Sequence, residues 1–421
     1  MALSESLREG FNHKEISRKR FLVLAAGAMA GTASFYPPGI KTENKITQIT
    51  DVFFDQSKEW ENATLDNRKF VEKNKQWIKN TSFGFSFSPE EMSGISRENF
   101  RTENGKIMGT KNLEALKFMH EDLGISEIRL GVRWKNSVDE KGNFDFSFYK
   151  PYFDYCLKND MKVSLNFGIK VFRWPEDHVP EKLLKDTPKN KSELTMKDDL
   201  TKESINFSKE LLTHFKNGYT EKELRNIYEL QPENEAFHMF GEHEWTMGDD
   251  YLVSLVSLSE SILPGRKILY NSSEFTDLNR IYGLFSKLSN FIDKERLTLG
   301  IDYYPFCPSD PLEPVLGHRL ESLIPGQKTL GDFKQQGYSL PELSEIQAEP
   351  WNNLPFPKDN LTSLKYITQR SYEDILNGSG GSTLRYWGFE YLMNSDEKIS
   401  LPVFDLFKKI SDVKADNNRR F

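Results

Sequence analysis

Short runs rich in β-branched and aromatic residues alternate with longer amphipathic segments from residue 82 onward. The amphipathic segments repeat with the period of a helix, as where Leu113, Leu116 and Met119 share one face and Gly124 follows at the end. Such an alternation is typical of βα units. The runs expected to be strands are residues 82–88, 127–134, 162–168, 226–231, 267–272, 297–304, 341–347 and 382–389.

Eight βα units between residues 82 and 389 predict an α/β fold with a single (β/α)8 (TIM) barrel. A doubly wound open sheet would show the same alternation. However, no strand is followed by a Gly-rich turn of the dinucleotide-binding or phosphate-binding type. The barrel is therefore the favoured architecture.

The N-terminal segment has the order of an export signal. A cationic cluster at residues 18–20 precedes an uncharged stretch, rich in Ala and Gly, at residues 21–35. This stretch is shorter than the roughly 20 residues that a helix needs to cross a bilayer, so stable membrane insertion is not expected unless the signal stays uncleaved. The cluster resembles the twin-arginine signal, with Lys19 where the second arginine belongs. The alternative is a buried N-terminal helix.

Three segments follow from these patterns: an export signal at 1–36, a polar helical extension at 37–80 and the barrel at 81–421. The expected location is outside the cytoplasm, in the periplasm, the medium or on the cell surface.

Composition narrows the function classes. The net charge is -7 with acidic and basic residues spread along the chain, which argues against nucleic-acid binding. The two cysteines, Cys156 and Cys307, show no metal-ligand spacing, and no cofactor motif is present, so neither a metal nor an organic cofactor is expected. Aromatic residues make up 13% of the chain, and aromatic side chains can pack a core or line a sugar-binding cleft.

Carboxylates stand at the ends of two predicted strands. The fourth strand runs into Asn234 and Glu235, and the seventh carries Glu345 and Glu349 on one face. Active sites of such barrels lie at the carboxyl ends of the strands, where these side chains should meet. Glycosidic bond cleavage with retention needs two carboxyl groups about 5–5.5 Å apart.

Strand four ending in Asn234-Glu235 and strand seven carrying a Glu resemble the clan of retaining (β/α)8 glycoside hydrolases that contains family 5 cellulases and mannanases and the barrel β-galactosidases. The resemblance covers about residues 82–412. It implies that Glu235 is the acid/base and Glu345 the nucleophile, because the Glu345-Ile346-Gln347 order is similar to that clan's β-galactosidases. Glu349 is the rival nucleophile.

The same resemblance implies five substrate-site residues. Arg129 in the second strand would hydrogen-bond the nucleophile, and Tyr304 in the sixth, or its neighbour Tyr303, would touch it. Trp387 in the eighth strand would form the floor of the cleavage subsite, and Trp174 would line the cleft. Asn234 would bind the sugar 2-hydroxyl.

The expected function is hydrolysis of β-linked oligosaccharides or polysaccharides by double displacement. A barrel of the same fold that only binds glycans is the alternative from another class, and a transglycosylase would use the same residues with another acceptor. The βα loops, which would set the sugar specificity, carry no pattern that identifies the substrate.

If residues 1–36 direct export, replacing Arg18 and Lys19 by Gln should retain the protein in the cytoplasm. Fractionation of cells that produce each form measures this. Finding the unaltered chain in the cytoplasm at full length contradicts the export signal.

Overall fold

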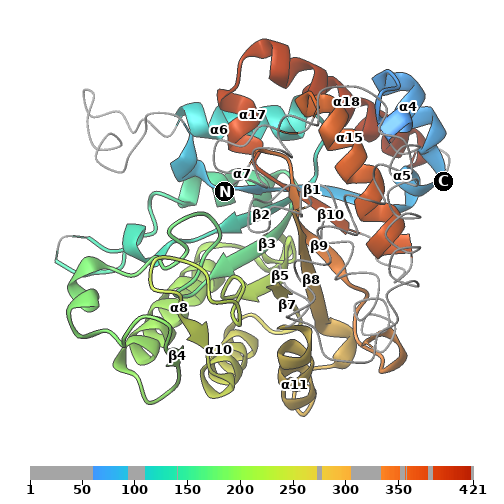
Figure 1. Cartoon of the computed structure of the whole chain (residues 1–421). Helices are drawn as coiled ribbons and strands as arrows, with labels where there is room; N and C mark the ends of the chain where they lie inside the picture. Colours follow the sequence, from blue (N-terminus) through green and yellow to red (C-terminus); the bar gives the residue numbers. More distant parts are fainter. Residues whose placement is uncertain are drawn as a thin grey trace, which may run out of the picture. The chain divides into compact units, whose positions relative to one another are not determined.

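The structure is a computed structural model of the whole chain (Figure 1). It describes residues 60–92, 110–139, 141–272, 277–304, 333–350, 356, 358–377 and 383–418. The predicted export segment 1–36 lies outside the described residues, and of the predicted extension 37–80 the described part forms two short helices. Asn62–Phe421 form one compact unit, to which everything below belongs, and Met1–Glu61 form another.

Eight parallel strands close into a barrel in the order β1-β10-β9-β8-β7-β5-β3-β2. The strands are β1 Ser82–Phe87, β2 Glu127–Gly131, β3 Lys162–Phe167, β5 Ile227–Pro232, β7 Lys267–Ser272, β8 Leu297–Tyr303, β9 Glu342–Gln347 and β10 Thr383–Trp387. Seven predicted runs contain one of them, and the run 226–231 covers β5 except for Pro232, so the predicted (β/α)8 fold is confirmed. A small two-stranded sheet, β4 Glu193–Leu194 with β6 Thr246–Met247, was not predicted.

Helices surround the barrel, as Figure 1 shows. They are α4 Asn67–Lys73, α5 Lys75–Asn80, α6 Thr110–Lys117, α7 Lys150–Lys158, α8 Asp199–Gly218, α9 Glu221–Leu224, α10 Asp249–Ile262, α11 Leu278–Leu288, α15 Asn360–Ser371, α17 Phe389–Asn394 and α18 Glu397–Asn418. Among the described residues, no helix combines the length and apolar character required to cross a membrane.

Aromatic side chains join the outside of the barrel to the helices. The Phe85 ring meets Phe389 of α17 and Phe407 of α18 edge-on, with ring centroids 4.8 Å apart in both pairs. Tyr386 of the adjacent strand packs against Phe407 in the same way. Edge-to-face contacts of this kind add to the free energy gained by burying the rings. Part of the high aromatic content therefore serves the core.

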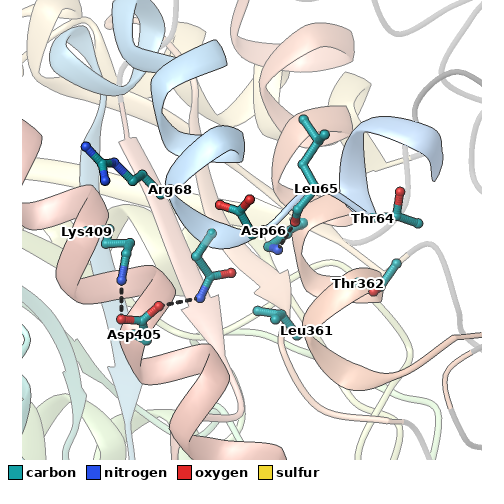
Figure 2. Close-up of a pocket in the computed structure, with 10 residues that line it drawn as sticks. Thr64, Leu65, Asp66, Arg68, Leu361, Thr362, Asp405 and Lys409 are labelled. Carbon is teal, nitrogen blue, oxygen red and sulfur yellow. Dashed lines mark hydrogen bonds and ion pairs between the residues drawn. The ribbon is translucent and has the colours of Figure 1, made fainter.

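Helix α4 is fastened to α18 by a polar contact. Asn67 donates hydrogen bonds to the carboxylate of Asp405 and to the carbonyl oxygen of Pro402, each at 2.8 Å. Figure 2 shows Asp405 in this contact, in a pocket of about 490 Å³ formed by residues of α4, α15 and α18. The pocket lies among the helices outside the barrel, and it contains none of the predicted site residues.

A buried ion cluster fills the barrel interior near the amino ends of the strands. Arg385 of β10 contacts three carboxylates, Glu127 at 3.0 Å, Glu229 at 2.9 Å and Glu342 at 2.6 Å. Burial raises the pKa of Glu229 to about 7, although Arg385 opposes the rise. One guanidinium thus holds carboxylates from three strands in a place that water does not reach.

Replacing Arg385 with Met should lower the free energy of unfolding by about 3–5 kcal/mol, because it leaves three buried carboxylates without their shared cation. Urea unfolding followed by circular dichroism measures the change. The matched control is Lys287→Met, which breaks an exposed pair with Asp249 and should cost less than about 1 kcal/mol. An equally small effect of Arg385→Met would contradict a structural role for the cluster.

Candidate active site

The two glutamates that follow β5 have different environments. Glu233 is fully buried, and its carboxylate accepts hydrogen bonds from the backbone N–H of Ile169 at 2.8 Å, the backbone N–H of Lys170 at 2.6 Å and the Tyr251 hydroxyl at 2.5 Å. A side chain on Gly168 would overlap the Glu233 carboxylate, so glycine is needed there. Glu233 therefore fixes the segment after β3, while Glu235 is the carboxylate left for chemistry.

Arg129 of β2 is the centre of a buried polar network. Its Nε donates to Gln231 Oε1 at 2.6 Å, one Nη donates to Asn234 Oδ1 at 2.5 Å, and the other donates to Glu345. The Phe172 ring lies against the guanidinium, 4.4 Å from its carbon. The ring restricts where the guanidinium can move, so Arg129 presents its donors in fixed directions.

Glu345 lies on β9 between two donors. One carboxylate oxygen accepts from Arg129 and the other from the Tyr304 hydroxyl. Burial raises the pKa of Glu345, Arg129 and Tyr304 act to lower it, and the charge of Glu235 raises it. The two hydrogen bonds stabilise the ionised form and fix the carboxylate in one orientation.

Glu235 is buried after β5, and its backbone N–H donates to Asn271 Oδ1 at 2.9 Å. Within the described part of the chain, no side chain donates a hydrogen bond or forms an ion pair with its carboxylate. Its charge nevertheless acts on the pKa of Glu345, so the two carboxyl groups are near neighbours. We call Glu235 and Glu345 the carboxylate pair.

Two further carboxyl groups next to the pair were not predicted from the sequence. Asp302 of β8 accepts from Asn271 and from Ser344, each at 2.7 Å, and burial together with Glu345 and Glu235 holds its pKa well above the usual range. It lies two residues before Tyr304, so the period of a strand could have indicated it. Glu176, in the loop after β3, had no such signal.

The rival Glu349 forms a different group of contacts. Its carboxylate pairs with Arg173 at 2.8 Å, and Arg173 also pairs with Glu390. The Arg173 guanidinium lies over the Trp387 ring, 4.0 Å from its centroid. Glu345, and not Glu349, is the residue that the structure places between Arg129 and Tyr304.

The two predicted tryptophans lie in different settings. Trp387 is half-buried at the end of β10, and its ring meets Tyr304 edge-on at 5.7 Å, beside the carboxylate pair. Trp174 is 65% exposed and packs against Phe240 at 5.9 Å. Trp387 is therefore adjacent to the pair, whereas Trp174 lies on the surface. In the described ranges, no group of three His, Cys, Asp or Glu has the arrangement of a metal site.

No family model and no curated protein matches this sequence. Among solved structures, a GH5 family lichenase from Caldicellulosiruptor sp. F32 has 14% identity and a TM-score of 0.46 over 81% of this chain and 94% of that one. The glycoside hydrolase family 5 enzyme PbGH5A from Prevotella bryantii B14 has 13% identity and a TM-score of 0.47 over 80% and 97%.

The exo-beta-1,4-mannosidase Op5Man5 from Opitutaceae bacterium strain TAV5 has 13% identity and a TM-score of 0.48 over 80% of this chain and 60% of that one. With identities this low and TM-scores below 0.5, none of these structures assigns a function to this chain. The function of this chain is therefore inferred from its own residues.

Removing the Tyr304 hydroxyl should raise the pKa of Glu345 further, because a hydrogen bond to the ionised form is lost. Titration of ¹³C-labelled glutamate carboxyls by NMR in Tyr304→Phe, with Glu345→Gln to assign the signal, measures the shift. Tyr303→Phe is the matched control and should leave it in place. If Tyr303→Phe raises the pKa of Glu345 and Tyr304→Phe does not, Tyr303 is the residue that hydrogen-bonds Glu345.

Proposed function

We propose that this protein is a retaining glycosidase that cleaves β-linked glycosides by double displacement. The observation that carries the proposal is the asymmetry of the carboxylate pair. Glu345 is held between Arg129 and Tyr304, while Glu235 lies nearby with its carboxylate unbonded among the described residues. Double displacement needs these two kinds of group, a fixed anion and a carboxyl that can give and take a proton.

In the first step, Glu345 attacks the anomeric carbon and forms a covalent glycosyl-enzyme, and the bond from that carbon to the leaving oxygen breaks. Glu235 gives its proton to the leaving oxygen as the bond breaks. Because Arg129 and Tyr304 already orient Glu345, little reorganisation is needed when the attack begins.

In the second step, a water takes the place of the departed group. Glu235, now ionised, takes a proton from this water as the water attacks the anomeric carbon, and Glu345 leaves as a carboxylate. The hydrogen bonds from Arg129 and Tyr304 stabilise the returning negative charge on Glu345. The cycle needs about 5–5.5 Å between the two carboxyl groups.

The substrate class that fits is a β-linked oligosaccharide or polysaccharide. Trp387, beside the pair, offers an aromatic edge or face to a sugar ring. An exported protein would meet such substrates outside the cytoplasm, and export is part of this proposal through residues 18–35. A transglycosylase would differ only in using a second sugar in place of water, and analysis of the products distinguishes the two.

A binding-only barrel is the second candidate. It would have no need of a carboxylate that is hydrogen-bonded by both a buried Arg and a Tyr, next to a second carboxylate without a partner. Both features are present around Glu345 and Glu235, and they favour the enzyme.

The two glutamates should have different phenotypes. Glu345→Gln removes the attacking group, so turnover should fall to background on every β-glycoside. Glu235→Ala should lose about 10²–10⁴-fold on substrates with poor leaving groups and much less on aryl glycosides whose leaving group needs no proton. Added azide should restore turnover in Glu235→Ala and give a β-glycosyl azide, because the small anion attacks the glycosyl-enzyme without needing a base.

Steady-state assays on a panel of β-linked aryl glycosides and oligosaccharides measure these effects. Glu349→Gln is the matched control, since Glu349 pairs with Arg173 outside the carboxylate pair. If Glu349→Gln abolishes turnover and Glu345→Gln does not, Glu349 is the nucleophile. If the wild type binds glycans without hydrolysing any, and neither substitution changes binding, the binding-only barrel is the correct reading.

A further inference from the structure

Glu176 lies in a tight loop that follows β3. Its backbone N–H donates to the Arg173 carbonyl oxygen at 2.9 Å, and its own carbonyl oxygen accepts from the Val171 N–H at 3.0 Å. Its φ angle is 67°, in the left-handed region that a glutamate rarely adopts. The loop therefore fixes Glu176 in a direction that an ordinary turn would not give.

Glu176 is only 5% exposed, and only one of its carboxyl oxygens has a protein partner. Oε2 accepts from Asn234 Nδ2 at 2.8 Å, and Oε1 makes no hydrogen bond to the residues that the structure describes. This oxygen is not among the buried side-chain atoms of the described residues that lack a partner, so it is open to solvent. Glu176 thus presents a polar atom that a water or a ligand can reach and bond.

The neighbours of Glu176 place that atom at the reaction centre. The titratable groups that face it are Glu235, Glu345 and Lys170, and the two glutamates are the charges that raise its pKa. A group close to both members of the carboxylate pair lies beside the anomeric carbon of a bound sugar. That carbon has two ring neighbours, the ring oxygen and C2, and only C2 bears a hydrogen-bonding substituent.

We propose that Glu176 is a specificity-determining residue that binds the C2 hydroxyl of the sugar whose bond is cleaved. The inference rests on the proposed glycosidase function and deepens it. Asn234 Nδ2 has a second N–H besides the one given to Glu176, so the two side chains together offer adjacent hydrogen-bonding groups to one hydroxyl. Hydrogen bonds to this hydroxyl strengthen in the transition state of glycoside cleavage.

Because Glu176 can ionise, its binding of the C2 hydroxyl should depend on pH. Burial, with Glu235 and Glu345 adding to it, raises the pKa of Glu176 to about 8, against the lowering effect of Asn234 and Lys170. Below that pH the carboxyl is neutral and donates to the hydroxyl oxygen. As the pH rises through about 8 the proton is lost, the donor disappears, and a third negative charge arises beside the pair. The substrate class is a neutral glycone with a free C2 hydroxyl.

The first test uses 2,4-dinitrophenyl β-glycosides, whose leaving group needs no proton from Glu235. For the wild type, kcat/KM should fall as the pH rises, with a midpoint near 8. In Glu176→Gln the amide donates at every pH, so this fall should be absent, while kcat/KM at pH 6–7 drops by about fivefold because an amide is a weaker donor. Asp177→Asn, a buried acid of the same loop bonded to the His243 N–H, should keep the wild-type profile.

The second test compares each 2-hydroxy glycoside with its 2-deoxy analogue in the wild type and in Glu176→Ala. The ratio of the two kcat/KM values should shrink by about tenfold in the variant, because the group that distinguishes the substrates is gone. The intrinsic reactivity of the 2-deoxy compound cancels in this comparison. Circular dichroism and urea unfolding check that each variant is folded.

Four results would overturn the assignment. An unchanged pH profile and an unchanged ratio in the Glu176 variants would mean that Glu176 only supports Asn234. Loss of turnover on poor leaving groups alone would make Glu176 the proton donor. A wild type that prefers 2-amino sugars, increasingly so above pH 8, would make it an anion that binds an ammonium. A wild type without any glycosidase activity would remove the proposed function and this inference together, whereas the first three results leave the glycosidase standing.

Discussion

The ion pair between Arg129 and Glu345 is the interaction on which the mouth of this barrel depends. Both side chains are buried, and a buried carboxylate is tolerated only when a cation and hydrogen bonds compensate the water it has lost. The same guanidinium also holds Gln231 and the side-chain oxygen of Asn234. Arg129 therefore orients residues of β5 and β9 together, and an error in its position would misplace both ends of the site.

A second buried arginine, Arg385, binds carboxylates at the other end of the barrel interior. Arg385 pairs with Glu127, Glu229 and Glu342 near the amino ends of the strands, where the cluster is a buried structural element. Glu229 Oε2 and Arg385 Nη1 have no hydrogen-bond partner among the described residues there. Near the carboxyl ends Arg129 compensates Glu345, and Glu235 and one oxygen of Glu176 are left without a partner among the described residues. The unbonded oxygens of Glu235 and Glu176 are not among the buried atoms of the described residues that lack a partner, so they are open to solvent and a ligand can bond them.

The sequence predicts the strands well because a buried strand has a strong local signal. Seven runs contain the observed strands and the eighth misses only Pro232 of β5, and side chains within or just after strands, such as Arg129, Tyr304 and Glu345, lie where the register places them. Loops have no such period. The direction of Glu176 depends on a left-handed backbone angle, and the exposure of Trp174 depends on how the same loop folds, so neither could be read from the order of residues.

The loops after β3 and β5 are joined by reciprocal bonds, and this explains how a loop residue can be placed accurately. The Glu233 carboxylate, after β5, accepts hydrogen bonds from the backbone N–H groups of Ile169 and Lys170. In return the Lys170 ammonium, after β3, donates to the carbonyl oxygens of Glu235 and His238. Each loop thus supplies a charged side chain that hydrogen-bonds the backbone of the other. Glu233 and Glu235 thus differ in role: the first bonds the backbone of the loop that carries Glu176, and the second lies near Glu345, on whose pKa its charge acts.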